Sequence, residues 1–300
     1  MNINFNIYYG VNPGEYICLN IRQRNGVAIH KMNQAGGNWS FELRINDAEL
    51  LQYGSEPFDY YYTLYSVDKI KRQEWTTQAH RLDFGQTGVQ QYTVYDTWIE
   101  IPHDSYLYSS AFTQCINRRE KVNHYRRTSP TILRLKVRAP QLRGDEKLIL
   151  TGSHPVLGEW DTSRGIPCFE QAPNEWICDI DAEYTVGEDL EYKFAAVRAN
   201  SNFPVIQQNI MWETCDNRHI VVPRMRKGEI VEYELSQAFF EIWNVKKAGT
   251  LIPVFSLRTE GSFGVGDFGD LKRMIDWIAY TGQRILQLLP INDTTVTHTW

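Results

Sequence analysis

The chain has 300 residues, of which 42% are hydrophobic and 22% are charged, and its formal net charge is -5. This length suggests two or three domains, each with enough apolar residues to form a hydrophobic core. The negative net charge gives no electrostatic reason to bind nucleic acid or an anionic membrane, and we predict neither partner.

The five cysteines are odd in number and show no C-x-x-C spacing. This argues against a disulfide framework and against a structural zinc site, so we predict no metal and no cofactor. The N-terminus, M-N-I-N-F-N-I-Y-Y-G, lacks the basic and apolar regions of a signal peptide. The sequence also contains no apolar run long enough to span a bilayer. We therefore expect a soluble, cytoplasmic protein.

Residues 1–101 are predicted to form a first β-rich module. Residues 3–9 alternate and are β-branched or aromatic, as expected of a strand. Turns that contain Gly, Pro or Asn separate it from further predicted strands at 16–21, 39–45, 58–65 and 91–101. Short strands without helical periodicity are typical of an antiparallel β-sandwich or barrel, and the fold we expect is an immunoglobulin-like sandwich.

A second module with the same pattern is predicted at 131–236. Residues 102–130 are polar, with basic pairs at Arg118-Arg119 and Arg126-Arg127, and we interpret them as a solvated linker. Residues 237–248 are interpreted as a second linker. The predicted strands of the second module are 132–137, 147–150, 176–180, 190–197, 219–222 and 230–235.

The pattern changes at residues 249–300. Leu251–Leu257 is a nearly continuous apolar run, which suits a strand that is buried on both faces of a parallel sheet. A glycine-rich loop follows, and then a helix with Asp267 or Asp270 as N-cap and Gly282 after its end. Residues 284–290 form a second buried strand. One β-α-β unit is too small to be a domain, so we expect the chain to be the N-terminal part of a longer protein.

Three sequence echoes occur in the same order in the two modules, which indicates a duplication. Trp75 precedes His80 by five residues, as Trp212 precedes Asn217, and an arginine follows each time. The segment N-W-S-F-E-L at 38–43 matches E-W-I-C-D-I at 175–180, and D-Y-Y-Y at 59–62 matches E-Y-K-F at 191–194.

Trp160 and Trp212 are candidates for binding a sugar, because both lie beside loop-forming residues rather than inside alternating strands. An indole can cover the apolar C–H face of a pyranose ring, while Lys193 and Asn217 can hydrogen-bond its hydroxyls. The alternative from spacing alone is that both tryptophans belong to the core.

The motifs L-G-E-W, E-W, E-Y-K-F, M-W-E and D-N-R, in this order, resemble the starch-binding modules of carbohydrate-binding family 20. The resemblance implies an α-glucan site made of Trp160, Lys193, Trp212 and Asn217. In the first module it implies a weakened or altered site, in which Trp75 is kept as a carbohydrate-binding candidate. It leaves Trp176 as a residue that supports the fold or borders a second site.

The last segment resembles the opening of the family 77 glycoside hydrolases, which are 4-α-glucanotransferases. The similar residues are A-G-T-L-I-P-V-F-S-L-R, S-F-G-V-G-D-F-G-D-L and I-L-Q-L-L-P-I-N-D-T. The resemblance implies a (β/α)8 TIM barrel with Asn292 and Asp293 at the end of its second strand. The competing interpretation of G-V-G-D-F-G as a phosphate loop fails, because no Gly-Lys-Ser/Thr follows.

This resemblance implies a retaining transfer of α-1,4-glucan segments or glucose between maltooligosaccharides or heteroglycans, carried out by three carboxylates. All three are expected beyond residue 300, so this portion is expected to bind starch-like glucan without catalysis. The alternatives are a non-catalytic glucan-binding scaffold and a pair of β-sandwiches with no affinity for sugar.

Overall fold

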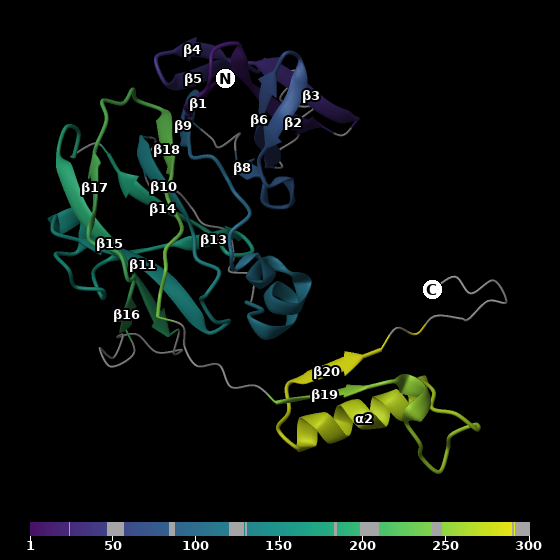
Figure 1. Cartoon of the computed structure of the whole chain (residues 1–300). Coiled ribbons are helices and arrows are strands. Elements are labelled where there is room, and N and C mark those ends of the chain that lie inside the picture. Colours follow the sequence, from purple (N-terminus) through teal and green to yellow (C-terminus); the bar gives the residue numbers. More distant parts are fainter. Residues whose placement is uncertain are drawn as a thin grey trace. The chain divides into compact units, whose positions relative to one another are not determined.

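The computed structural model describes residues 1–23, 25–46, 57–83, 88–119, 129, 131–182, 185–198, 210–241, 248–289 and 291 (Figure 1). They divide into two compact units, Met1–Glu241 and Ile242–Trp300. Arg126, Arg127, Asn292 and Asp293, which the sequence analysis singled out, lie outside the described residues.

The first unit is built on one sheet that runs through both predicted modules. Its strand order is β13-β14-β10-β18-β9-β1-β5-β4. The strands are β13 (Phe169–Ala172), β14 (Glu175–Asp181), β10 (Ile132–Arg138), β18 (Glu229–Glu234), β9 (Gln91–Asp96), β1 (Asn2–Tyr8), β5 (Asn38–Arg44) and β4 (Asn33–Ala35). The parallel pairing of β9 with β18 joins the two modules through continuous backbone hydrogen bonds.

A second sheet completes each sandwich. In the first module it has the order β3-β2-β6-β7, with β8 paired to β6, and in the second the order is β12-β11-β15-β16, with β17 paired to β15. The strands are β2 (Glu15–Gln23), β3 (Gly26–Lys31), β6 (Phe58–Ser66), β7 (Lys69–Gln73), β8 (His80–Leu82), β11 (Glu146–Gly152), β12 (Ile166–Pro167), β15 (Asp189–Arg198), β16 (Ile210–Trp212) and β17 (Arg218–Val221). The predicted mainly-β sandwich class is confirmed.

The two hydrophobic cores lie on opposite faces of the joint sheet. Ile230 belongs to the core of the first module, whereas its neighbour Val231 belongs to the core of the second. Because successive side chains of a strand point to opposite faces, the two smaller sheets cover opposite sides of the joint sheet (Figure 1). The second module contributes β13, β14, β10 and β18 to the joint sheet. One face of these strands carries the core of the second module, and the first module packs on the other face.

The two modules have equivalent strand pairings, as expected of the predicted duplication. Trp39 lies opposite Ile7 and Trp176 opposite Val137, and both tryptophans are buried. The first strand of each module pairs antiparallel with one neighbour and parallel with the other.

The strand registers correct one detail of the predicted repeat. His80 lies opposite Tyr60, and Arg218 lies opposite Tyr192. Since Tyr60 and Tyr192 are equivalent positions of the D-Y-Y-Y and E-Y-K-F segments, His80 corresponds to Arg218 and not to Asn217. The match in sequence between Trp75–His80 and Trp212–Asn217 therefore differs from the structural alignment by one residue at His80 and by two residues at Trp75.

Part of the predicted linker 102–130 folds against the first unit. It forms a short 3-10 helix, η2 (Ser105–Tyr108), and one turn of π-helix, η3 (Ala111–Ile116). Arg119 forms an ion pair with Glu170 at 2.5 Å and its guanidinium lies 5.2 Å from the ring centroid of Trp176. Arg119 is therefore packed rather than solvated, although the domain boundaries themselves stay predictions.

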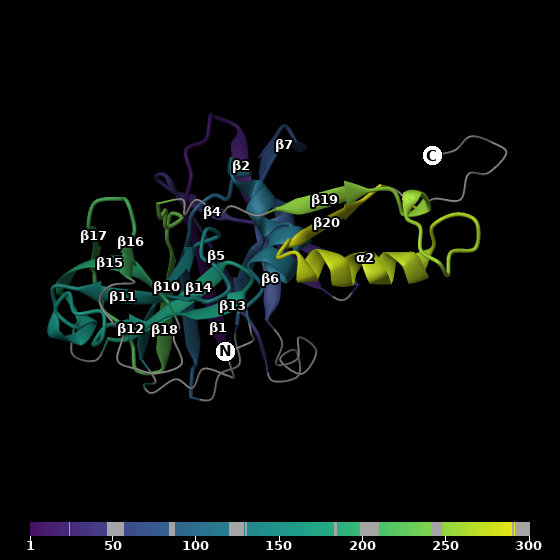
Figure 2. The ribbon, with the colours of Figure 1, turned by 90° about the horizontal axis from the view of Figure 1, so that it is seen from below.

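The second unit is the predicted β-α-β arrangement, with β19 (Gly249–Ile252) parallel to β20 (Ile285–Leu288) and α2 (Phe268–Tyr280) alongside them (Figure 2). Its first strand is shorter than predicted, because Pro253 ends it and a 3-10 turn, η6 (Val254–Ser256), follows. Exposed and half-buried residues alternate along β19 and β20, so the prediction that these strands are buried is wrong for the residues that the structure describes. Of the two predicted N-cap candidates, Asp267 is the N-cap, and Asp270 completes a capping box with it. Within the described ranges no helix has the length and apolar character needed to cross a membrane.

Candidate functional site

The outer face of the β11–β15–β16 sheet carries the predicted sugar-binding residues of the second module. Along β15, Tyr192 and Phe194 belong to the hydrophobic core, so Lys193 and Ala195 point to the outer face. Trp212 lies directly opposite Ala195 and has 39% of its surface exposed. Lys193 and Trp212 therefore share one open face.

Asn217 is brought to the same face by a hydrogen bond. Its side-chain amide donates to a carboxylate oxygen of Glu191 at 2.8 Å. Glu191 precedes Lys193 by two residues on β15, so the two side chains lie on the same side of the sheet. The sequence analysis did not assign a role to Glu191, although it stands inside the E-Y-K-F motif.

The loop that carries Trp160 begins where β11 ends. The Trp160 backbone N–H donates to the carbonyl of Gly152 at 2.8 Å, and the preceding residue, Thr151, lies opposite Lys193. Trp160 is half-buried and has a φ of 64°, and Gly158 in the same loop has a φ of 82°. These left-handed backbone conformations turn the loop back toward the end of β11, where Thr151 lies opposite Lys193.

A buried ion pair supports the turn between Trp212 and Asn217. Glu213 is only 2% exposed and accepts hydrogen bonds from Arg218 at 2.9–3.1 Å and from the Phe194 backbone N–H at 2.9 Å. Because Glu213 follows Trp212 and Arg218 follows Asn217, this pair holds both ends of the turn. In the sequence, Glu213 directly follows Trp212 and Arg218 directly follows Asn217, but the ion pair between Glu213 and Arg218 was not predicted.

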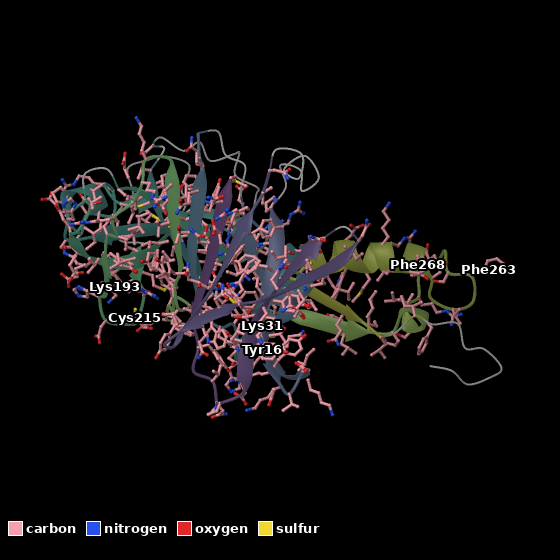
Figure 3. The ribbon with its side chains drawn as sticks, turned by 90° about the horizontal axis from the view of Figure 1, so that it is seen from above. Tyr16, Lys31, Lys193, Cys215, Phe263 and Phe268 are labelled. Carbon is pink, nitrogen blue, oxygen red and sulfur yellow. The ribbon has the colours of Figure 1, made fainter. Side chains whose placement is uncertain are left out.

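Cys215 is an exposed thiol in this turn. It interacts electrostatically with both Glu213 and Lys193, and Figure 3 shows it close to Lys193. Partial burial, followed by the nearby Glu213 carboxylate, raises the pKa of the Cys215 thiol. Cys215 is thus an exposed thiol beside the outer face, which the sequence analysis did not single out.

In the first module, Trp75 does not occupy the position of Trp212. Gln73 lies opposite Thr63 in the same way as Trp212 lies opposite Ala195, and Tyr61 takes the place of Lys193. Trp75 is half-buried and its ring meets that of Tyr108 edge to face at 5.2 Å. Its role as a sugar-binding residue stays a prediction.

One group of described residues has the composition of a metal site. His80, Asp96 and Glu234 bring one ligand atom each to within 4.8 Å of one another, and all three side chains are buried. The same atoms are engaged in hydrogen bonds and ion pairs with one another.

Comparison with known families assigns two segments of the chain. Residues 131–231 match the family described as starch binding domain, and residues 252–299 match the family described as 4-alpha-glucanotransferase. One segment of the chain is thus similar to a starch-binding domain and another to a 4-alpha-glucanotransferase. The outer face built by Lys193, Trp212 and Asn217 lies within the first of these segments.

Curated relatives carry the name of the second of these families. The chain is 28% identical over 172 residues to the 4-alpha-glucanotransferase DPE2 of rice, Oryza sativa subsp. japonica, covering 56% of this chain and 17% of that protein. It is 52% identical over 58 residues to the 4-alpha-glucanotransferase of Chlamydia trachomatis, covering 18% of this chain and 11% of that protein. The chain therefore spans less than a fifth of the length of these relatives.

Solved structures with partial likeness include the family 20 module of the maltotetraose-forming amylase of Pseudomonas saccharophila. The identity is 13%, the TM-score is 0.27, and the match covers 35% of this chain and 99% of that one. The glucoamylase of Hormoconis resinae gives 18% identity and a TM-score of 0.29, with 37% and 18% covered. TM-scores this low support no inference about function.

Proposed function

We propose that the starch-binding domain holds an α-1,4-glucan on the outer face of the β11–β15–β16 sheet. Trp212 and Trp160 would cover the apolar faces of glucose rings, while Lys193 donates hydrogen bonds to their hydroxyls and Asn217 donates or accepts them. The observation that supports this most directly is that the strand register places Lys193 and Trp212 on one open face of the segment that matches a starch-binding family. Maltooligosaccharides, starch, glycogen and heteroglycans are the ligand class.

The whole protein is proposed to be a 4-α-glucanotransferase. Support comes from the match of residues 252–299 and from the curated relatives of that name. In the retaining reaction proposed here, a carboxylate forms a glycosyl-enzyme intermediate and an acceptor glucan replaces water in the second step. Residues 1–300 would contribute glucan binding, and the carboxylates would lie outside them. We also propose a cytoplasmic location, which fits the five free thiols.

Isothermal titration with maltoheptaose and β-cyclodextrin tests the binding proposal, with cellohexaose as a control for the linkage. Saturable heat with the two α-linked ligands and none with the β-linked ligand is the expected result. If neither α-linked ligand gives heat, the binding proposal is wrong.

The transfer proposal has a separate assay, in which maltotriose is incubated with the 300-residue chain or with a protein that continues beyond it. Longer and shorter products should form only with the longer protein, and their absence there would favour a scaffold role.

A further inference from the structure

Charged side chains fill the contact between the two sandwiches. On β10, Arg134 and Lys136 alternate with core residues and would face water in an isolated module, yet both are 0% exposed because the first module covers them. Lys136 forms an ion pair with Glu232 at 2.6 Å and donates to the Arg81 carbonyl of the first module at 3.0 Å. Arg134 forms an ion pair with Asp179 at 2.7 Å.

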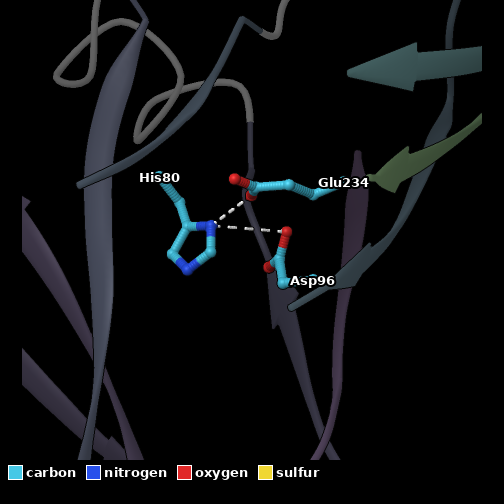
Figure 4. A group of neighbouring side chains, drawn as sticks. All are labelled: His80, Asp96 and Glu234. Atoms are coloured by element: carbon cyan, nitrogen blue, oxygen red, sulfur yellow. Dashed lines mark hydrogen bonds and ion pairs between the residues drawn. The ribbon is translucent and has the colours of Figure 1, made fainter. Parts of the chain in front are cut away.

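His80 stands at the centre of this contact and belongs to the first module. Its Nδ1 is 2.5 Å from a carboxylate oxygen of Glu234 on β18 of the second module, and 3.7 Å from Asp96 on β9 (Figure 4). Its Nε2 is 3.1 Å from both carboxylate oxygens of Glu74. Both ring nitrogens therefore face carboxylates, which accept but cannot donate when ionised, and only the imidazolium form has two N–H donors.

We propose that His80 is a buried imidazolium that binds the first sandwich to the second, and that loss of its proton weakens the junction between them. The carboxylates of Glu74, Asp96 and Glu234 face its ring nitrogens. The rings of Tyr60 and Tyr62 pack against the imidazole, and Lys136 and Arg138 form ion pairs with Glu234. This junction is distinct from the glucan-binding face and does not depend on the proposed function.

The charges around His80 agree with this assignment. Burial by itself would lower the pKa of His80, but the carboxylates of Glu74, Glu234 and Asp96 together hold it well above its usual value. Burial would raise the pKa of Glu234, but His80, Arg138 and Lys136 hold that pKa below its usual range, so Glu234 is ionised. Glu234 also contacts Arg138 at 2.9 Å, so its second oxygen has a cationic partner.

The first module has a histidine where the second module has the arginine of its buried ion pair, since His80 is equivalent to Arg218. Glu213 and Glu74 are equivalent, because each accepts the backbone N–H of the equivalent residue in the neighbouring strand. In the second module this glutamate pairs with Arg218 and supports the turn of the glucan-binding face. In the first module it pairs with His80, which reaches across to the second module instead.

A divalent cation in place of the proton is the competing interpretation, and the geometry disfavours it. Two ligands of a tetrahedral zinc ion at about 2.0–2.1 Å are roughly 3.3 Å apart. The Nδ1 of His80 and the Glu234 oxygen are separated by 2.5 Å, which is a hydrogen-bond distance. The Lys136 ammonium, 3.9 Å from the same Glu234 oxygen, would also repel a cation.

The pH dependence follows from the sign of the shift. The pKa of His80 is higher in the folded state than in the unfolded chain. The protonated imidazole therefore stabilises the folded state fully below the unfolded pKa of about 6.5, and this stabilisation is lost as the pH rises toward the folded pKa. In that window the unfolding equilibrium constant should rise by up to about tenfold per pH unit through His80. The raised pKa of Asp96, about 6 because of burial opposed by His80 and Lys136, acts at lower pH.

Nuclear magnetic resonance of the imidazole nitrogens in the full chain tests the proposal directly. One histidine should keep both nitrogens protonated at pH 8.5, and its signals should be missing in His80→Gln. Denaturant unfolding between pH 6.5 and 8.5 should show a shallower pH dependence in His80→Gln than in the wild type. His103→Gln, which removes an exposed histidine, is the matched control and should leave the pH dependence unchanged.

If His80→Gln does not fold, Glu234→Gln can assign the imidazole resonance of His80 instead. Removing the Glu234 carboxylate should lower the pH at which His80 titrates. A His80 ring that titrates near pH 6.5, or equal pH dependence in the wild type and His80→Gln, would overturn the proposal. One zinc ion per chain whose removal by a chelator lowers the melting temperature would also overturn it, in favour of a metal site.

Discussion

Replacing Trp212 by alanine should weaken glucan binding without unfolding the domain. Trp212 ends β16 on the outer face and exposes 39% of its surface, so a ligand can cover that part of the indole. A tryptophan presents roughly 250 Å² in total, which leaves about 100 Å² for the sugar to bury. At about 25 cal/mol per Å², this contact contributes about 2.5 kcal/mol, or roughly a 60-fold change in Kd.

The assay is isothermal titration of maltoheptaose into Trp212→Ala and into the wild type, with thermal unfolding of both. Trp277→Ala is the matched control, because Trp277 on α2 is 51% exposed and lies in the other compact unit. We expect the melting temperature of Trp212→Ala to stay close to that of the wild type, because a half-exposed residue at a strand end contributes little to the core. An unchanged Kd in Trp212→Ala would refute the placement of the glucan on this face.

Lys193→Met should weaken maltoheptaose binding by about 1 kcal/mol, roughly fivefold in Kd, through loss of a hydrogen bond, with titration as the measurement; unchanged affinity would exclude Lys193 from the site. Glu213→Ala should lower the free energy of unfolding by about 3–5 kcal/mol, measured in denaturant, because Arg218 would lose its buried partner. Gly158→Ala should destabilise by about 1 kcal/mol or more and also weaken binding, because the φ is 82° and the added methyl group would lie 2.6 Å from the Arg164 carbonyl carbon. Maltoheptaose should slow alkylation of Cys215 by iodoacetamide, followed by mass spectrometry, while the exposed Cys115 reacts at an unchanged rate; equal rates with and without ligand would place the glucan elsewhere.

Much of the fold could be read from local patterns. Alternation over residues 132–137 correctly placed Leu133, Leu135 and Val137 on one face, and all three are in the core. Asp267 and Gly282 correctly marked the ends of α2, because a helix N-terminus needs an acceptor side chain and its C-terminus a residue that tolerates positive φ. The strand order of the β15–β16 hairpin puts Lys193 and Trp212 on one face of the sheet, because Trp212 lies opposite Ala195, two residues from Lys193.

The junction between the sandwiches was not predictable in the same way. Alternation tells which residues share a face, but it does not tell what covers that face. Arg134 and Lys136 therefore read as solvent-facing, and only the tertiary structure shows them buried under the first module. The same holds for His80: its partners Asp96 and Glu234 are distant in sequence, and the parallel pairing of β9 with β18 brings them together. Short-range periodicity determined the strands and their core faces, whereas the pairing of two edge strands decided which charges lost contact with water.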